Sequence, residues 1–423
     1  KLSYKDTAQQ NSYVTIPHAA YSYEQTETAA NVDEDIIDSL TGGRLVGSVT
    51  SFENFAECPL RYYLRYGVDL KEREEFTFSP VNFGVVLHAV IREVCDEIKK
   101  NGESYYLISE EKRREMVKRS VAAITDIYQN SILKDSSRNS FMIKRMEDLA
   151  DRTVWAMGEQ LKCGDFVPFV FEHKFNMEVG DGDRKQLMSG TIDRVDICEN
   201  GTDVYVRIID YKTGKKDFNI VKTYYGIDIQ LMVYMEAAMK LVAKMRPGKN
   251  VLPAGVFYYN ISDPIVSATN ESAEEIEDKI KGELRLKGMV NSDKDIAEKM
   301  DNTEGTSLNI PVSRKADGGF DSRRSKVMNT EQFNMLGRFV DVRAVDTADR
   351  IAGGDIRRSP YKDGQFSSCD RCPYGAVCGF SVDLPGCNYR KLKKFDDEVL
   401  WNNIKEGVDE NGKKMDTGAE ERD

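Results

Sequence analysis

Apolar residues recur at two spacings along the chain, and each spacing predicts a different kind of element. Spacings of three and four residues predict helices, whereas alternating or continuous apolar runs predict strands. The predicted helices cover residues 81–100, about 108–162, 227–245, 271–304 and 330–352. The predicted strands cover residues 166–175, 186–198, 204–211 and 251–260. This order predicts an α/β fold in which helices flank a mixed central sheet, with helical insertions at about 101–165 and 271–350.

Polar, weakly patterned segments lie on both sides of one predicted domain. Residues 1–47 are interpreted as a linker or as the remnant of a missing preceding region, and residues 48–385 as the domain itself. The run from Thr50 to Glu53 is typical of a capping box and indicates the start of a helix. Residues 386–423 form a basic and then polar tail, for which we expect disorder from about Gly407 onward.

Composition narrows the class of protein without deciding its function. The 423 residues include 60 Lys and Arg against 71 Asp and Glu, a net charge of −11, and 40% are hydrophobic. No apolar run approaches about 18 residues and no signal-peptide pattern is present, so we expect a cytoplasmic protein without a membrane partner. The segment 42–48 lacks the Lys of a phosphate-binding P-loop, so we expect no ATP site. The acidic balance argues mildly against a nucleic-acid partner, although net charge does not describe charge distribution.

The richest chemistry lies on a predicted hairpin whose turn is Asn200-Gly201. Asp193 stands on one strand, while Asp210 and Lys212 at the end of the next share one face because side chains alternate. Adjacent strands lie about 4.8 Å apart, so Asp193 can approach Asp210. Two carboxylates and a nearby backbone carbonyl suit Mg²⁺ or Mn²⁺, with Lys212 placed to stabilise charge on a phosphoryl oxygen. The alternative is an ordinary Asp–Lys pair on a surface hairpin.

Eight cysteines are too few for a disulfide scaffold in a chain of this length, and four of them are crowded together. Cys369, Cys372 and Cys378 offer three thiolates in a short loop, one fewer than a tetrahedral metal site needs. The fourth ligand would be the nearby Cys387 or a distant cysteine. Three others, in apolar surroundings, are expected to be buried and structural. These are Cys95, Cys163 and Cys198.

The run Asp210-Tyr211-Lys212, with Asp193 upstream, resembles the active-site motif of the PD-(D/E)xK nuclease superfamily. The resemblance implies a restriction-endonuclease-like fold and an Mg²⁺-dependent deoxyribonuclease that hydrolyses phosphodiester bonds. It also implies that Asp193, Asp210 and the backbone carbonyl of Tyr211 hold the metal, while Lys212 acts in catalysis.

Two further segments resemble the RecB-like branch of this superfamily and stand in the expected order. Gln230 and Tyr234 match its Gln-x-x-x-Tyr helix, and His88 matches its upstream histidine. The resemblance implies that His88 assists at the metal or the phosphate, and that Gln230 and Tyr234 support the site and contact DNA. A buried structural histidine and a packing role for the helix pair are the alternatives. Glu172 is either a carboxylate behind the metal ligands or an exposed strand residue.

RecB-like nucleases with an iron–sulfur cluster place one cysteine before the nuclease fold and three after it, and the cysteines here resemble that arrangement. The resemblance implies a [4Fe–4S] cluster held by Cys58, Cys369, Cys372 and Cys378. Such an iron–sulfur staple would join the two ends of the domain and lower the entropy of the unfolded chain. Structural zinc and unligated thiols are the alternatives.

About residues 44–385 resemble, more specifically, the C-terminal portion of the B subunits of AddAB helicase–nucleases. The resemblance implies an exonuclease that acts on single-stranded DNA from duplex ends, delivered within a complex with the A subunit during double-strand-break processing and recombination repair. The alternatives are a non-catalytic DNA-binding or assembly module of the same complex and a related iron–sulfur nuclease of CRISPR adaptation. The segments that carry this resemblance are the first-cysteine element, which is the run of residues 52–59 around Cys58, and residues 221–235, 253–259, 287–290 and 367–380.

Basic and aromatic residues are candidates for contact with DNA. Tyr62 and Tyr66 could stack on bases, and the stretch from Arg61 to Tyr66 is favoured because it adjoins Cys58. A solvated charged surface is the alternative for each residue. The basic candidates are Arg61, Arg65, Arg314, Lys315, Arg323, Arg324, Lys326, Arg357, Arg358, Arg390, Lys391, Lys393 and Lys394.

Overall fold

The central element is a seven-stranded mixed sheet in the order β1-β3-β4-β5-β6-β7, with β2 paired to β3. The computed structural model describes Val32 and residues 46–71, 80–127, 137–179, 186–267, 269–384 and 386–420. The predicted linker, residues 1–47, lies outside the described residues except for positions 32, 46 and 47. The strands are β1 (Val46–Ser48), β2 (Val167–Val179), β3 (Gln186–Asn200), β4 (Asp203–Lys212), β5 (Asn250–Asn260), β6 (Lys287–Asn291) and β7 (Val327–Met328).

Strand β3 organises the sheet. The long β2 pairs with it in antiparallel orientation along one edge. The other edge is shared by the parallel β1, which pairs as far as Ser189, and the antiparallel β4, which pairs from Arg194 onward. Strands β4 and β5 are parallel, β5 and β6 antiparallel, and β6 and β7 parallel. This arrangement confirms the predicted mixed sheet. Between Ser189 and Arg194 the partner of β3 on this edge changes from β1 to β4, and we call this stretch the branch point of the sheet.

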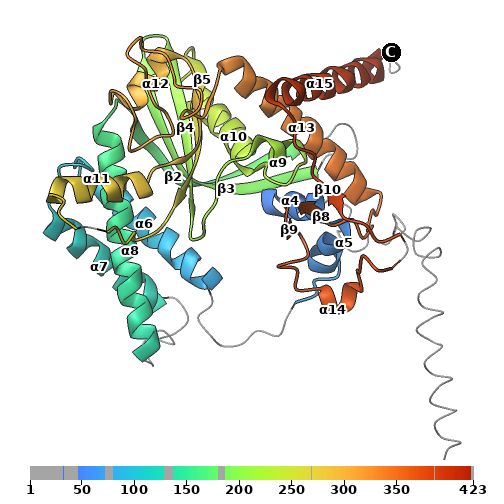
Figure 1. The fold of residues 1–423 in the computed structure, drawn as a ribbon, viewed down its shortest axis with the longest axis horizontal. Coiled ribbons are helices and arrows are strands. Elements are labelled where there is room, and N and C mark those ends of the chain that lie inside the picture. The colour runs from blue at the N-terminus through green and yellow to red at the C-terminus, as the bar shows by residue number, and fades with distance from the viewer. Residues whose placement is uncertain are drawn as a thin grey trace, which may run out of the picture.

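Helices cover both faces of the sheet (Figure 1), which confirms the predicted α/β fold. One face carries α6 (Pro80–Lys100), α7 (Glu110–Ile127) and α8 (Ser137–Lys162). The other face carries α4 (Val49–Glu57), α9 (Ile220–Tyr224), α10 (Gln230–Met245), α13 (Thr330–Ala352) and α15 (Asp397–Glu420). Within the described ranges, no helix is long and apolar enough to cross a membrane.

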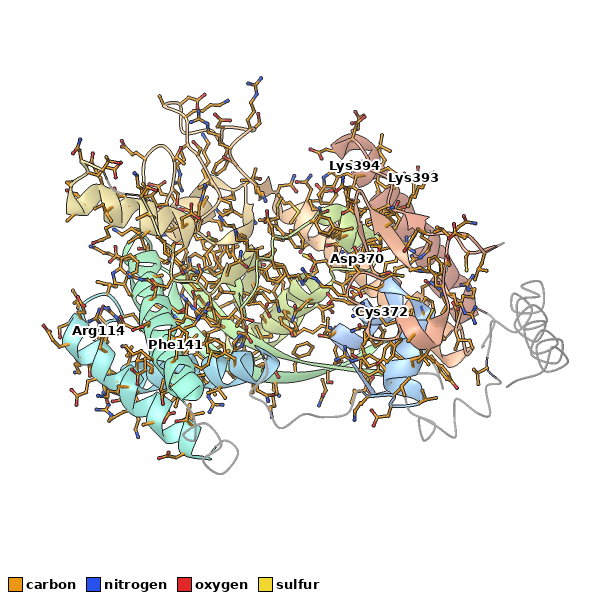
Figure 2. The ribbon with its side chains drawn as sticks, turned by 60° about the horizontal axis from the view of Figure 1, so that its bottom comes forward. Arg114, Phe141, Asp370, Cys372, Lys393 and Lys394 are labelled. Atoms are coloured by element: carbon orange, nitrogen blue, oxygen red, sulfur yellow. The ribbon has the colours of Figure 1, made fainter. Side chains whose placement is uncertain are left out.

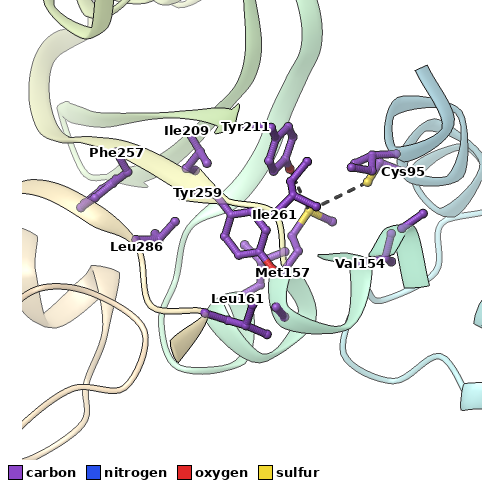
Figure 3. Close-up of a cluster of buried hydrophobic side chains, with 14 of the residues drawn as sticks. Cys95, Val154, Met157, Leu161, Ile209, Tyr211, Phe257, Tyr259, Ile261 and Leu286 are labelled. Atoms are coloured by element: carbon purple, nitrogen blue, oxygen red, sulfur yellow. Dashed lines mark hydrogen bonds between the residues drawn. The ribbon is translucent and has the colours of Figure 1, made fainter. Parts of the chain in front are cut away.

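The alternation of side chains along β4 fills two cores. Val206 and Ile208 are buried in the core beneath α10 and α13, whereas Tyr211 is buried in the core beneath α6 and α8. In that second core the sulfur of Met157 lies 3.9 Å from both the hydroxyl of Tyr211 and the thiol of Cys95 (Figure 3). The strand that carries the predicted nuclease motif is therefore held rigidly from both faces.

A second, smaller sheet brings the C-terminal cysteines against the beginning of the domain (Figure 1). Its strands are β8 (Tyr361–Asp363), β9 (Phe366–Ser367) and β10 (Arg390–Lys391), and the short helix α14 (Gly375–Cys378) adjoins them. It faces α5 (Pro59–Tyr62) and the π-helix η1 (Tyr63–Gly67). The hydroxyl of Tyr374 donates a hydrogen bond to the carbonyl of Leu70 at 3.0 Å, and the guanidinium of Arg390 donates to the carbonyl of Ala56.

The segment 271–350 is not the purely helical insertion that we expected. It contains α11 (Ala273–Glu283), α12 (Lys294–Met300) and α13, but it also adds β6 and β7 to the sheet. A Cβ on Gly288 of β6 would lie 1.9 Å from the carbonyl oxygen of Val256 in β5, so this close pairing requires glycine. A five-residue strand that contains glycine carries little periodic signal in the sequence.

The C-terminal tail also differs from the expected disorder, because α15 continues past Gly407 to Glu420. Leu400 and Ile404 lie one helical turn apart and are buried in the same core as α13. Val408, one turn further on, packs against this core as well, so the helix that these residues anchor continues into the polar segment for which disorder was expected.

The start of α4 is capped differently from the predicted capping box. Ser48, rather than Thr50, is the N-cap, and its hydroxyl accepts a hydrogen bond from the amide of Ser51 at 3.1 Å. Glu53 consequently lies beyond the first turn of α4, where its carboxylate contacts another helix instead of its own.

Candidate active site

Side chains from one helix and two strands meet beside the branch point of the sheet. His88 comes from α6, Glu172 from β2 and Asp193 from β3. Nδ1 of His88 lies 3.5 Å from Oδ1 of Asp193 and 3.7 Å from Oε1 of Glu172. One ligand atom from each residue lies within 4.8 Å of the other two. An imidazole and two carboxylates at this spacing form a donor set suited to a divalent cation.

Glu172 reaches this position through an unusual backbone conformation. Its φ of +47° lies in the left-handed region, which residues other than glycine rarely adopt. Its neighbours in β2 pair with Arg194 and Ile192, so Glu172 lies opposite Asp193. Strain of this kind costs about 1–3 kcal/mol and is concentrated at functional sites. The sequence left two interpretations of Glu172 open, and the structure brings its carboxylate to His88.

Asp210 and Lys212, at the end of β4, form the other half of the site. The antiparallel register of β3 and β4 brings Asp193 beside Asp210, as the hairpin predicted. Oδ2 of Asp193 accepts a hydrogen bond from the backbone N–H of Tyr211 at 2.6 Å. Nζ of Lys212 forms an ion pair with Oδ2 of Asp210 at 2.5 Å, and the Asp210 side chain is buried.

The crowding of acidic groups changes their proton affinities. Burial raises the pKa of Asp210 to about 7, and the charge of Asp193 adds to the rise while Lys212 opposes it. Burial alone would lower the pKa of His88, but its interactions with the carboxylates of Asp193 and Glu172 outweigh burial and raise that pKa to about 10. Carboxylates held this close repel one another, and a divalent cation would relieve the repulsion. The residues present therefore fit such a cation.

A chain of hydrogen bonds joins the catalytic-motif lysine to α10. Nζ of Lys212 donates to Oε1 of Gln230 at 3.0 Å, and Nε2 of Gln230 donates to the hydroxyl of Tyr234 at 2.9 Å. Gln230 and Tyr234 lie one turn apart, and both are buried. The three residues, which were predicted from two separate motifs, form one connected group.

A carboxylate that the sequence did not single out fixes the beginning of α10. Oε1 of Glu53 accepts hydrogen bonds from the backbone N–H groups of Ile229 at 2.9 Å and Gln230 at 3.0 Å. The first turn of a helix leaves such groups without partners, and a negative charge at this end is favourable. The signal in the sequence is the place of Glu53 in the segment before Cys58 that resembles the first-cysteine element.

An ion pair between the half-buried Lys216 and the buried Asp228 lies next to Glu53. Nζ of Lys216 lies 3.0 Å from Oδ1 of Asp228, and the hydroxyl of Tyr258 donates to the same oxygen at 2.6 Å. Burial raises the pKa of Glu53 to about 7, with Lys216 opposing the rise and Asp228 adding to it. Glu53, Lys216 and Asp228 act as one electrostatic group behind the site, and the sequence did not indicate Lys216 or Asp228.

Comparison with protein families shows to which superfamily the chain belongs. The model of the PD-(D/E)XK nuclease superfamily matches residues 47–379. The chain belongs to the PD-(D/E)XK nuclease superfamily. The match spans the whole constellation described above, from Glu53 to Tyr258, and the mixed sheet flanked by helices agrees with it.

Relatives of this PD-(D/E)XK chain carry a more specific name, that of the B subunit of an ATP-dependent helicase/deoxyribonuclease. The protein of that name from Clostridium acetobutylicum is 34% identical over 403 residues, which cover 93% of this chain and 34% of the relative. The one from Lachnoclostridium phytofermentans is 34% identical over 411 residues, 95% of this chain and 35% of the relative. The one from Thermoanaerobacter sp. is 33% identical over 380 residues, which cover 87% of this chain and 33% of the relative. The chain thus spans about a third of the length of these curated relatives.

The four cysteines that were predicted to hold a cluster line one cavity of the PD-(D/E)XK chain. Cys58, Cys369, Cys372 and Cys378 all line it, whereas the buried Cys387 is not among the lining residues. In the described part of the chain, no three of these sulfurs lie within 4.8 Å of one another. The cavity therefore brings the four predicted ligands together, and Cys387 lies outside it.

Several predicted DNA contacts have structural roles in the PD-(D/E)XK chain. The guanidinium groups of Arg314 and Arg390 donate hydrogen bonds to backbone carbonyl oxygens. Arg357 donates to the carboxylate of Asp355 at 2.7 Å. The ring of Tyr62 is buried, so it presents no face on which a base could stack. Arg390 and Arg357 thus support the surroundings of the second sheet, and Arg314 supports the loop that follows α12.

Proposed function

We propose that this chain is the deoxyribonuclease domain of a helicase–nuclease B subunit, and that it hydrolyses phosphodiester bonds of single-stranded DNA with Mg²⁺ or Mn²⁺. The observation that carries the proposal is the convergence of His88, Asp193, Asp210 and Lys212 at one place. The names of the relatives, which combine helicase and deoxyribonuclease, support a complex with an A subunit that delivers the strand in double-strand-break processing.

In this proposal His88, Glu172, Asp193 and Asp210 hold the divalent cation, together with the backbone carbonyl of Tyr211. When bound, the cation supplies an activated water and neutralises charge on the phosphate. The chain contributes the fixed positions of these ligands. Oδ2 of Asp193 is oriented by the N–H of Tyr211, which leaves its other oxygen directed toward His88.

Lys212 is proposed to stabilise the negative charge that develops on a phosphoryl oxygen during hydrolysis. Its ammonium group is oriented by two partners, the carboxylate of Asp210 and the amide oxygen of Gln230. Tyr234 orients that amide in turn. A fixed cation is more effective than a mobile one because it needs no reorganisation when the charge forms.

We further propose that Cys58, Cys369, Cys372 and Cys378 hold a [4Fe–4S] cluster with a structural role. Their shared cavity supports this ligand set. Cys58 directly follows α4, and α4 carries the Glu53 that holds the start of α10. The cluster would therefore anchor the helix on which the position of Gln230 depends.

The experiment that tests the nuclease proposal compares Asp210→Ala with the parent chain on end-labelled single-stranded DNA in Mg²⁺. Loss of a metal ligand should reduce the cleavage rate by at least about 100-fold. Asp203→Ala is the matched control, because Asp203 lies on the same strand at the end remote from the site. Equal rates for the parent and Asp210→Ala would overturn the catalytic assignment.

A further inference from the structure

A cleft of about 1510 Å³ opens where β4 and β5 end, directly beyond Lys212. Its walls are the turn of residues 213–217, the helix α8 and the loop that leads to Lys326. Helix α8 belongs to the first insertion of the nuclease fold and the loop to the second. Both insertions therefore border a cleft whose lining includes Thr213, the residue after the proposed catalytic lysine, and Asn260, which pairs with that lysine in the sheet.

The charge of this cleft is opposite to that of the whole chain. Nine Lys or Arg residues line it against four Asp or Glu, whereas the chain carries a net charge of −11. Arg145, Lys215, Arg323 and Arg324 are exposed, and they form no ion pair with the residues that the structure describes. Cations on three different elements around one cleft attract a polyanion, and their arrangement allows contacts with successive phosphates of a nucleic-acid backbone.

Exposed apolar side chains accompany these cations. The side chain of Phe141 on α8 is 65% exposed, and that of Ile265 is fully exposed. Figure 2 shows Phe141 on the side of the molecule away from Cys372. Arg145 follows Phe141 by one helical turn, so both lie on the face of α8 that lines the cleft. A cation beside an exposed aromatic ring is typical of surfaces that bind single-stranded nucleic acid, whose bases are free to stack.

We infer that this cleft binds the single strand of DNA next to the scissile phosphate, with phosphates on Arg145, Lys215, Arg323 and Arg324 and a base on Phe141. The inference rests on the proposed nuclease function and adds the path of the substrate to it. Two candidates from the sequence, Arg323 and Arg324, thus remain in the DNA-binding surface, while Arg314 supports the loop that carries them.

The test measures binding of a fluorescein-labelled 20-nucleotide oligo(dT) in EDTA, where no cleavage occurs. The variant Arg145→Glu/Arg323→Glu/Arg324→Glu should raise the dissociation constant at least tenfold. The matched control, Lys118→Glu/Lys162→Glu/Lys244→Glu, changes the charge equally at exposed positions outside the cleft and should stay within about twofold of the parent. Loss of three phosphate contacts should also reduce the slope of log affinity against log salt by about 2.

A second pair of variants tests the aromatic contact. Phe141→Ala should weaken binding at least about fivefold, and Phe141→Trp should retain it, because stacking needs a flat ring. Melting temperatures check that each variant is folded. If the triple variant does not fold, the single change Lys215→Glu in an exposed turn replaces it, and this variant should also raise the dissociation constant for oligo(dT).

The outcomes separate this inference from the nuclease proposal. If the parent binds oligo(dT) but does not cleave it in Mg²⁺, the nuclease proposal fails and the DNA-binding cleft stands. If the parent cleaves and the cleft variant binds as tightly as the control variant, the inference is overturned. Retained DNA binding with lost association with a partner protein would assign the cleft to an acidic protein segment and would overturn it as well.

Discussion

Oε1 of Glu53 lies 3.0 Å from the backbone nitrogen of Gln230, a residue 177 positions further along the chain. This hydrogen bond joins α4, which leads directly to Cys58, to α10, which carries the amide that orients Lys212. The end of the domain that holds the cysteines is thereby connected to the site through one side chain.

Glu53→Ala should lower the free energy of unfolding by about 1–2 kcal/mol, because the two N–H groups at the start of α10 lose their acceptor. It should also slow cleavage of single-stranded DNA, since Gln230 no longer holds Lys212 in place. Glu53→Gln keeps an oxygen acceptor and should retain most of the stability and rate. Urea unfolding and initial rates measure both effects. An unchanged rate in Glu53→Ala would contradict the positioning role.

Glu172→Ala should raise the Mg²⁺ concentration needed for half-maximal cleavage by about 10-fold or more, because the donor set around His88 loses one carboxylate. Calorimetric titration of Mg²⁺ without DNA measures the same loss independently of activity. Glu178→Ala, a change on the same strand and outside this donor set, is the control. The same Mg²⁺ affinity in Glu172→Ala and the parent would exclude Glu172 as a ligand.

One half of the site could be predicted because its information is local. Asp193, Asp210 and Lys212 stand on neighbouring strands, where a period of two and a short hairpin determine which side chains meet. Glu53 could not be predicted in the same way. It bonds to backbone groups 176 and 177 residues away, and such a contact leaves no pattern in side-chain types. Glu172 depends on a left-handed φ that no local motif announces.

The fold shows the same division between local and distant information. Helix α13 matches the predicted 330–352, because a long amphipathic helix carries its own periodic signal. Strand β6 was missed, because its pairing depends on the close approach that Gly288 allows to β5. The part of α15 beyond Gly407 was expected to be disordered, because the packing of Val408, and of Ile404 and Leu400 one and two turns earlier, beside α13 is a property of the folded protein and not of the segment.

Stability should depend on pH through a carboxyl pair between α10 and α13. Burial raises the pKa of Asp341 to about 8, and so do the hydrogen bond that protonated Asp341 donates to the Glu236 carboxylate and the negative charge of Glu236, while Lys240 opposes the rise. Between about pH 4 and pH 8 the folded chain binds a proton that the unfolded chain releases, so stability falls as pH rises through this window. Asp341→Asn removes that proton and should be more stable than the parent at pH 8.5 by about 1 kcal/mol or more. Urea unfolding at pH 5 and pH 8.5 measures the slope, and an identical slope in both proteins would contradict this assignment.

Removal of one cysteine should distinguish the proposed cluster ligands from the remaining thiols. The parent, purified without oxygen, should be brown and contain about four irons per chain. Cys58→Ser should lose most of this iron and melt several degrees lower, because the two ends of the domain are no longer joined. Cys387→Ser should keep the iron, since Cys387 does not line the cavity that the other four share. One zinc ion per chain in a colourless parent, or equal iron in Cys58→Ser and Cys387→Ser, would contradict the ligand set.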